Sequence, residues 1–187
     1  MIVFVLSLLF CQCIANQLNF EIGVIEKGTR YIQKVQTNLY TNHVYYSTPA
    51  HNDIAESHKI QDFNKGMQIT CIPSLQECHL MSIDTTTYQN AGNLTESIVH
   101  MWNNGINTIV DENSTLIQQH VTLFGTEIIN TAFLSQEMRK MLQTFRYPLY
   151  RTKLIPDGAA IVNYPLKANH TLSGRSIQSQ PLINHGI

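Results

Sequence analysis

Two turn signals divide residues 54–84 into three short segments of high β-propensity, and this pattern constrains the fold more than any other stretch of the chain. The first turn, residues 62–66 (DFNKG), combines an Asp that can bond its own backbone with Asn and Gly, which tolerate positive φ. The second turn, residues 73–76 (PSLQ), separates the segments MQITCIP and ECHLMSID. An alternating apolar pattern also begins at Ile54. We therefore predict a three-stranded meander over about residues 54–84.

The remaining chain adds further strands and two helices. Residues 20–48 place apolar side chains at intervals near two and are predicted to be extended. An amphipathic stripe predicts a helix over residues 93–104, with Asn93 as its N-cap and Gly105 as its end. A second stripe, within residues 133–145 (FLSQEMRKMLQTF), predicts another helix.

The second helix carries methionines on its apolar stripe. Ser135 is its predicted N-cap, and Pro148 follows its end. The methionines serve either core packing or an adaptable binding surface. Residues 115–129 and 147–155 are predicted strands before and after this helix.

The order of these elements is strands, helix, strand, helix, strand, which is typical of an α+β fold. We expect a mostly antiparallel sheet of about five strands with two helices packed on it. Residues 16–53 are interpreted as a β-prone N-terminal segment and residues 54–152 as the domain. Residues 153–187 are interpreted as an irregular C-terminal tail, because they are rich in Gly, Pro, Asn and Ser.

Residues 1–15 have the character of a signal peptide. Apolar side chains run from Ile2 to Ile14, and the small Ala15 follows at the predicted cleavage point. The apolar run is shorter than the ~20 residues that a membrane span needs. An uncleaved anchor and a buried strand are the alternatives. Cleavage predicts a mature chain without stable membrane insertion.

Three N-glycosylation sequons agree with secretion, and they begin at Asn93, Asn113 and Asn169. Removal of the signal peptide leaves Cys71 and Cys78 as the cysteines of the mature chain. In an oxidising compartment these two are predicted to form a disulfide bond, with a free nucleophilic thiol as the alternative. The expected location is extracellular, reached through the endoplasmic reticulum.

Composition and motifs argue against several functional classes. Charged residues make up 13% of the chain and the formal net charge is -1, so no basic surface for nucleic acid or anionic membrane is expected. The 8 histidines show none of the spacings of a metal site. The chain also lacks a nucleophile elbow, a phosphate-binding loop and a dinucleotide fingerprint. We therefore expect no metal, no cofactor and no enzymatic activity.

Asp62, Gly66 and Cys78 are spaced as D-x3-G-x11-C, a layout that resembles the BRICHOS domain. In that family an Asp-aromatic pair precedes a glycine, and a strand then carries the first of two cysteines. Residues 129–150 are similar to the family's closing segment, with its helix and Pro-x-aromatic strand. The resemblance covers about residues 54–152.

The chain departs from this family at the second cysteine, which would fall near Leu142, where none occurs. Cys71 instead lies one strand before Cys78, so the bridge would join two strands across a loop of eight residues. A loop of this length predicts ~2–3 kcal/mol of stabilisation. The second helix would then be held by apolar packing of Leu142 and its neighbours.

The resemblance implies a secreted chaperone-like domain that binds extended β-prone segments, including those of its own propeptide, by strand addition. Candidate own-chain segments are residues 20–26 (FEIGVIE) and 159–166 (AAIVNYPL), with an ordinary strand and a docked tail as the alternatives. The resemblance also implies a buried Asp62 that governs a pH-dependent self-association, whereas the local sequence explains it as a turn residue. A secreted binding module for a ligand, receptor or protease, without chaperone activity, is the second function left open, and homo-oligomers fit both.

Overall fold

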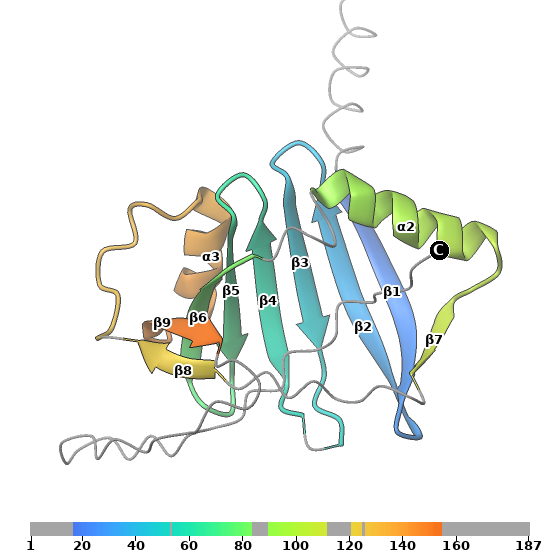
Figure 1. Cartoon of the computed structure of the whole chain (residues 1–187), viewed down its shortest axis with the longest axis horizontal. Helices are drawn as coiled ribbons and strands as arrows, with labels where there is room; N and C mark the ends of the chain where they lie inside the picture. The colour runs from blue at the N-terminus through green and yellow to red at the C-terminus, as the bar shows by residue number, and fades with distance from the viewer. Residues whose placement is uncertain (1–16, 53, 84–89, 112–120, 125, 155–187) are drawn as a thin grey trace, which may run out of the picture.

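The computed structural model describes residues 17–52, 54–83, 90–111, 121–124 and 126–154, which Figure 1 shows in colour. The elements in this part of the chain, in order, are β1 (Gln17–Glu26), β2 (Thr29–Asn38), β3 (His43–Thr48), β4 (Ser57–Asp62), β5 (Met67–Ile72), β6 (Glu77–Ser82), α2 (Ala91–Asn103), β7 (Thr108–Asp111), β8 (Val121–Phe124), α3 (Gln136–Phe145) and β9 (Leu149–Leu154).

The strands form a single sheet in the order β7-β1-β2-β3-β4-β5-β6-β9-β8. Strands β1 to β6 are consecutive antiparallel neighbours, and β8 is antiparallel to β9. In contrast, β7 is parallel to β1 and β9 is parallel to β6. The prediction of about five, mostly antiparallel strands is therefore wrong, because the described chain forms a mixed sheet of nine strands.

The sequence pattern underestimates the sheet for two physical reasons. The predicted meander is present as β4, β5 and β6, but its first strand also pairs with β3, so the three strands before it extend the same sheet. Strand β7 has only 4 residues, too few for a period-two pattern to be recognised. Of the predicted strand over residues 115–129, residues 121–124 form β8 and residues 126–129 are not in a strand. Residues 115–120 and 125 lie outside the described residues.

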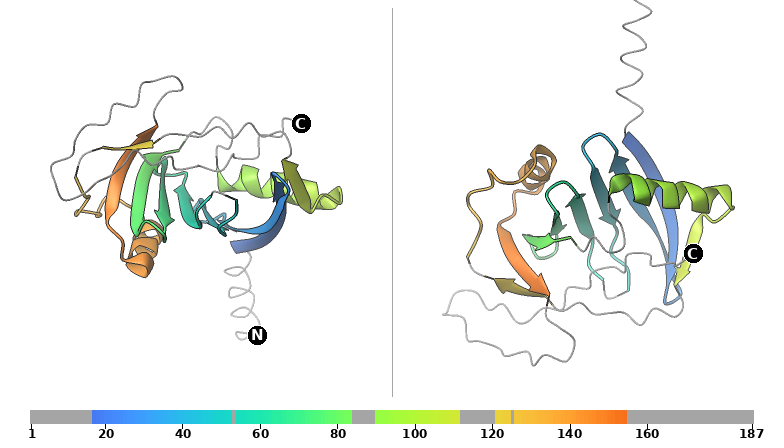
Figure 2. Two further views of the ribbon diagram at one scale, coloured as in Figure 1. Left: turned by 90° about the horizontal axis from the view of Figure 1, so that it is seen from below. Right: turned by 45° about the horizontal axis from the view of Figure 1, so that its top comes forward.

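The two helices cover opposite faces of the sheet at opposite ends, as Figure 2 shows. Val44 and Tyr46 of β3 belong to the apolar cluster beneath α2. Tyr45 lies between them in sequence, pairs with Ile60 and packs in the other cluster, beneath α3. Neighbouring side chains in a strand point to opposite faces, so α2 and α3 lie on different sides.

Helix α2 packs over β1, β2 and β3 through Leu94 and Ile98, both buried. Its N-cap is Asn90, whose side chain accepts a hydrogen bond from the Asn93 backbone N–H at 2.8 Å. The prediction of Asn93 as N-cap is therefore wrong, because Asn90 satisfies this N–H and the helix begins earlier. Gly105 follows the helix with φ +75, a conformation that glycine adopts without steric cost.

Helix α3 packs over β4, β5, β6 and β9 through Met138 and Met141, which are 0% and 6% exposed. Of the two roles considered for its methionine stripe, these two side chains have the core role. Ser135 is the N-cap, as predicted, and accepts a hydrogen bond from the Met138 backbone N–H at 3.4 Å. Arg146 ends the helix in the left-handed conformation.

Candidate functional site

Asp62 lies at the end of β4 and is 1% exposed. Its Oδ1 accepts a hydrogen bond from the Lys65 backbone N–H at 2.9 Å, so it forms the predicted Asx-turn. Its Oδ2 lies 2.9 Å from Nε2 of His43 on the neighbouring strand β3. Asp62 is therefore buried and also organises the turn, whereas its role in pH-dependent self-association stays a prediction.

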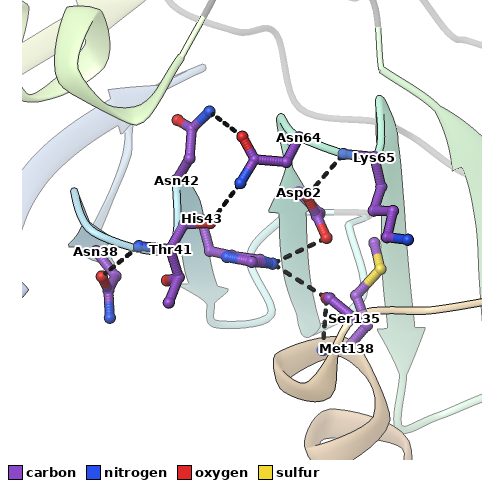
Figure 3. Close-up of polar contacts among 9 residues, drawn as sticks. All are labelled: Asn38, Thr41, Asn42, His43, Asp62, Asn64, Lys65, Ser135 and Met138. Carbon is purple, nitrogen blue, oxygen red and sulfur yellow. Dashed lines mark hydrogen bonds and ion pairs between the residues drawn. The ribbon is translucent and has the colours of Figure 1, made fainter.

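His43 extends this cluster to helix α3 (Figure 3). Its Nε2 also lies 3.0 Å from Oγ of Ser135, the N-cap of α3. The contact joins residues 92 positions apart in sequence. Beside the cluster, the Asn42 side-chain amide donates a hydrogen bond to Oδ1 of Asn64 over 2.9 Å. Figure 3 marks this bond with a dashed line. The polar cluster therefore fixes the start of α3 against β3 and β4.

The residue types of this cluster are those of a catalytic triad, but their geometry differs from one. A relay places the carboxylate on one imidazole nitrogen and the hydroxyl on the other. Here Asp62 and Ser135 both face Nε2, and Nδ1 of His43 is buried without a hydrogen-bond partner in the described chain. Because the carboxyl group and the hydroxyl share one nitrogen, the arrangement does not match a catalytic relay.

Gly66 ends the turn after Asp62 and has φ +63, so a residue with a Cβ there would be strained. Cys71 and Cys78 are directly opposite each other in β5 and β6 and form the predicted disulfide bond, with their Cα atoms 4.0 Å apart. The Cys78 N–H bonds to the Pro148 oxygen at 2.9 Å, on the β9 side. The cysteines are therefore a non-hydrogen-bonded pair, at which side chains of antiparallel strands approach most closely.

A second buried polar cluster lies at the far end of β1. His51 Nε2 is 3.0 Å from Oε2 of Glu26, and its Nδ1 is 2.8 Å from the Pro49 carbonyl oxygen. The ring stacks on Tyr31, with centroids 3.7 Å apart. Each ring nitrogen of His51 therefore has an oxygen partner from a different segment of the chain. This cluster ties the loop after β3 to the β1–β2 hairpin.

Two basic groups on the α2 side of β4 and β6 have perturbed pKa values. Burial lowers the pKa of Lys59 to about 8. Burial also lowers the pKa of His79, and its hydrogen bond to Glu77 opposes this effect. Both groups therefore favour their neutral forms more than the free side chains do.

The outer edge of β1 is incompletely paired. Strand β1 runs over 10 residues, but β7 pairs only with residues 23–26. The Gly23 N–H donates to the Asn107 oxygen at 3.2 Å, so Gly23 directs its backbone polar groups outward. Backbone groups alternate along a strand, so Gln17, Asn19 and Glu21 also direct their N–H and C=O groups outward. We call this outer edge of residues 17–22 the open edge; no described strand pairs with it.

Aromatic side chains border the open edge on the α2 side. Phe20 is 6% exposed and meets Trp102 of α2 edge to face, with ring centroids 5.4 Å apart. Trp102 itself is 45% exposed, and Ile106 just after the helix is 47% exposed. The open edge therefore combines backbone groups that no described strand pairs with and accessible apolar surface. Sequence reasoning missed this site, because nothing in the residues of β1 distinguishes an edge strand from an interior strand.

The predicted glycosylation sites have different outcomes. Asn93 lies in the first turn of α2 with an exposed side chain, whereas Asn113 and Asn169 lie outside the described residues. Residues 159–166 also lie outside them, and residues 20–26 are part of strand β1. Within the described ranges, no three His, Cys, Asp or Glu side chains group closely enough to hold a metal ion. No helix in those ranges is long and apolar enough to cross a membrane.

No protein family model matches the chain, and neither a curated protein nor a solved structure matches it.

Proposed function

We propose that this chain is a secreted, non-enzymatic binding protein that takes up extended β-prone peptide segments at the open edge and thereby acts as a chaperone against aggregation. The observation that carries the proposal is the half of β1 beside Phe20 and Trp102, with which no described strand pairs. A row of outward N–H and C=O groups accepts an added strand, and this uptake competes with pairing between the segments themselves.

The residues of the open edge support this role. Natural sheets protect exposed edges with lysines, prolines, bulges or covering elements. Residues 17–22 (QLNFEI) contain neither Lys nor Pro, and β1 pairs with β2 in unbroken register over its whole length. The pairing of β1 with β2 therefore contains no β-bulge, and a six-residue strand can pair along the outer edge.

Secretion and the BRICHOS resemblance belong to the same proposal. The disulfide bond is compatible with an oxidising compartment. Cleavage after Ala15 would leave one residue before β1, so the open edge would begin at the mature N-terminus. The spacing of Asp62, Gly66 and Cys78 supports a relationship to a family of chaperone-like domains.

Peptide binding can be followed with the protein's own fluorescence, because Trp102 is the single tryptophan of the chain. The disulfide-bonded protein secreted from eukaryotic cells is titrated with a tryptophan-free, β-prone peptide of eight residues. Strand addition beside Phe20 is expected to shift the Trp102 emission to shorter wavelength, because a bound strand removes water from the indole. A flat emission spectrum up to millimolar peptide would contradict the proposal.

A pair of variants isolates the backbone of the open edge. Asn19→Pro removes an outward N–H while the bonds to β2, which come from the even-numbered residues, remain. Asn19→Ala removes the same side chain and keeps the N–H. We expect Asn19→Pro to lose peptide binding and Asn19→Ala to retain it, with both folded by circular dichroism. Wild-type binding by Asn19→Pro would exclude the open edge as the site.

Chaperone activity has its own test. Substoichiometric protein is added to an unrelated amyloid-forming peptide, and fibril growth is followed by thioflavin fluorescence. The wild type and Asn19→Ala are expected to lengthen the lag phase, whereas Asn19→Pro is expected not to. Binding in the Trp102 assay without any effect on fibril growth would leave a binding module without chaperone activity.

The alternative function, a binding module for a ligand without chaperone activity, has one observation in its favour. A shallow concavity of about 340 Å³ lies over β1, β2 and β3, on the face that α2 does not cover. Polar side chains dominate its lining: Asn19, Glu21, Lys34, Gln36, Tyr45 and Ser47. Such a surface suits a polar ligand rather than an apolar strand. Ligand-dependent protection of Lys34 from acetylation would identify this use of the molecule.

A further inference from the structure

We infer that the open edge selects amphipathic strands, in which apolar residues on the α2 side alternate with polar residues on the other side, with a basic residue opposite Glu21. The inference rests on the proposed function and names the class of peptide that it binds. It follows from the chemical difference between the two faces of β1.

The α2 side of the open edge is apolar. Leu18, Phe20 and Ile22 direct their side chains to this side, because they alternate in phase with the cluster beneath α2. Phe20 and Ile22 are 6% and 3% exposed, and Trp102 extends over Phe20. Side chains of an added strand that point to the α2 side would lie beside these residues. Apolar side chains there gain burial, whereas charged ones lose hydration without a partner.

The other side of the open edge is polar. Asn19 and Glu21 direct their side chains to this side, and the Asn19 oxygen accepts a hydrogen bond from the Gln36 amide at 2.7 Å. The Glu21 side chain is 66% exposed and lies 3.8 Å from Lys34, one strand further from the edge. Toward the edge, no described basic side chain pairs with Glu21. Opposite charges on directly paired residues stabilise neighbouring strands, so a Lys or Arg of the bound strand fits here.

Strand β7 shows how the same edge treats a strand of this chain. It pairs with residues 23–26 of β1, directly beyond the open edge. Ile109 points to the α2 side and is 7% exposed, whereas Val110 points to the other side and is 51% exposed. An incoming strand occupies the continuation of this position, so the same division into a buried and an exposed side applies to it.

The alternation is tested with two peptides of equal composition. The peptide VTVKVTVT alternates apolar and polar residues, and VVVVKTTT groups them. Both are titrated into the full secreted chain, with Trp102 emission as the readout. We expect the alternating peptide to bind about tenfold more tightly, because the grouped peptide cannot place its valines on one side.

The charge preference is tested by a reciprocal exchange. Wild-type protein is expected to prefer VTVKVTVT over VTVEVTVT by about two- to fivefold, and Glu21→Lys is expected to reverse this order. Glu137→Lys, in the first turn of α3 and away from β1, is a matched control that changes the net charge in the same direction and by the same amount. Its peptide preference should equal that of the wild type.

The outcomes separate this inference from the proposed function. Equal binding of both arrangements of valine, together with an unchanged order in Glu21→Lys, overturns the inference and leaves peptide binding intact. Absence of binding by any peptide overturns both. Sedimentation velocity supplies a further outcome. If the wild type is a dimer that peptides do not disturb, and Asn19→Pro is a monomer, the open edge binds a second copy of the chain instead of a peptide.

Discussion

Lys59 offers a sharp test of how burial controls the stability of this sheet. It lies in β4 between Tyr46 and Thr70 of the adjacent strands. Its side chain is half-buried, and its Nζ is 5.4 Å from the centroid of the Tyr46 ring. Among the described residues, no carboxylate forms an ion pair with it. Burial without a compensating charge lowers the pKa of Lys59 from 10.5 to about 8.

The sign of the effect on stability follows from linkage. Between pH 8 and 10.5 the unfolded chain keeps its proton on Lys59 while the folded chain loses it, so the free energy of unfolding rises with pH. The full difference between these pKa values corresponds to about 3 kcal/mol, which is the destabilisation below pH 8. Between pH 7 and 9.5 the same values predict a gain of about 2 kcal/mol.

We predict that Lys59→Met raises the free energy of unfolding at pH 7 by about 2 kcal/mol, since methionine keeps the aliphatic packing and cannot be charged. The loss of the contact with Tyr46 reduces the gain below the full linkage value. The assay is urea denaturation at pH 7, 8, 9 and 9.5. The wild type should gain stability over this range, and the variant should show a flatter profile.

Lys34→Met is the matched control, because the Lys34 side chain is 68% exposed. Its stability should remain within about 0.5 kcal/mol of the wild type at each pH. If Lys59→Met and the wild type had parallel stability profiles, burial would not be perturbing this amine. A Lys34→Met variant that gained as much stability as Lys59→Met would also contradict the role of burial at Lys59.

Three further predictions concern the disulfide, a buried histidine and the aspartate cluster. Replacing both Cys71 and Cys78 by Ala should lower the free energy of unfolding by about 2–3 kcal/mol, the chain-entropy value for a loop of eight residues, in urea denaturation; a variant as stable as the wild type would contradict this. Because the pKa of His79 is lowered in the folded chain, the wild type loses stability as the pH falls through 6.5 and below. Between pH 7 and 5, His79→Gln should therefore lose less stability than the wild type. His100→Gln, at an exposed position, is the control and should follow the wild type. Asp62→Asn keeps an acceptor for the Lys65 N–H and should cost about 1–3 kcal/mol, whereas Asp62→Ala removes that acceptor and the carboxyl partner of His43 and should cost about 3–5 kcal/mol; thermal melts with the opposite order would exclude the cluster as the cause.

Local features of the sequence predicted local structure well. The turn at residues 62–66, the cap at Ser135 and the pairing of Cys71 with Cys78 each depend on residues within a few positions of one another. Hydrophobic periodicity also located both helices, because it reports which side of a helix is buried. It does not report which face of the sheet a helix covers. The opposite placement of α2 and α3 was therefore beyond the reach of the pattern.

The candidate sites required contacts that no local pattern encodes. The contact of His43 with Ser135 joins positions 92 apart in sequence. The open edge depends on β7 ending its pairing at Gly23, where the Asn107 oxygen meets the Gly23 N–H. An alternating strand pattern describes an edge strand and an interior strand equally. Only the assembled sheet distinguishes the two.

The position of the disulfide explains how α3 is held without a cysteine near Leu142. In the family that the sequence resembles, a covalent bridge would join the strand of Cys78 to this helix. Here Cys78 bonds to Cys71 instead, and both sulfur-bearing side chains lie in the apolar cluster with Met138 and Met141. At its N-terminus, α3 is joined to the sheet through the contact of its N-cap Ser135 with His43. Within the described part of the chain, the helix is held by this packing and by the contact of Ser135 with His43, and both can be tested separately from the disulfide.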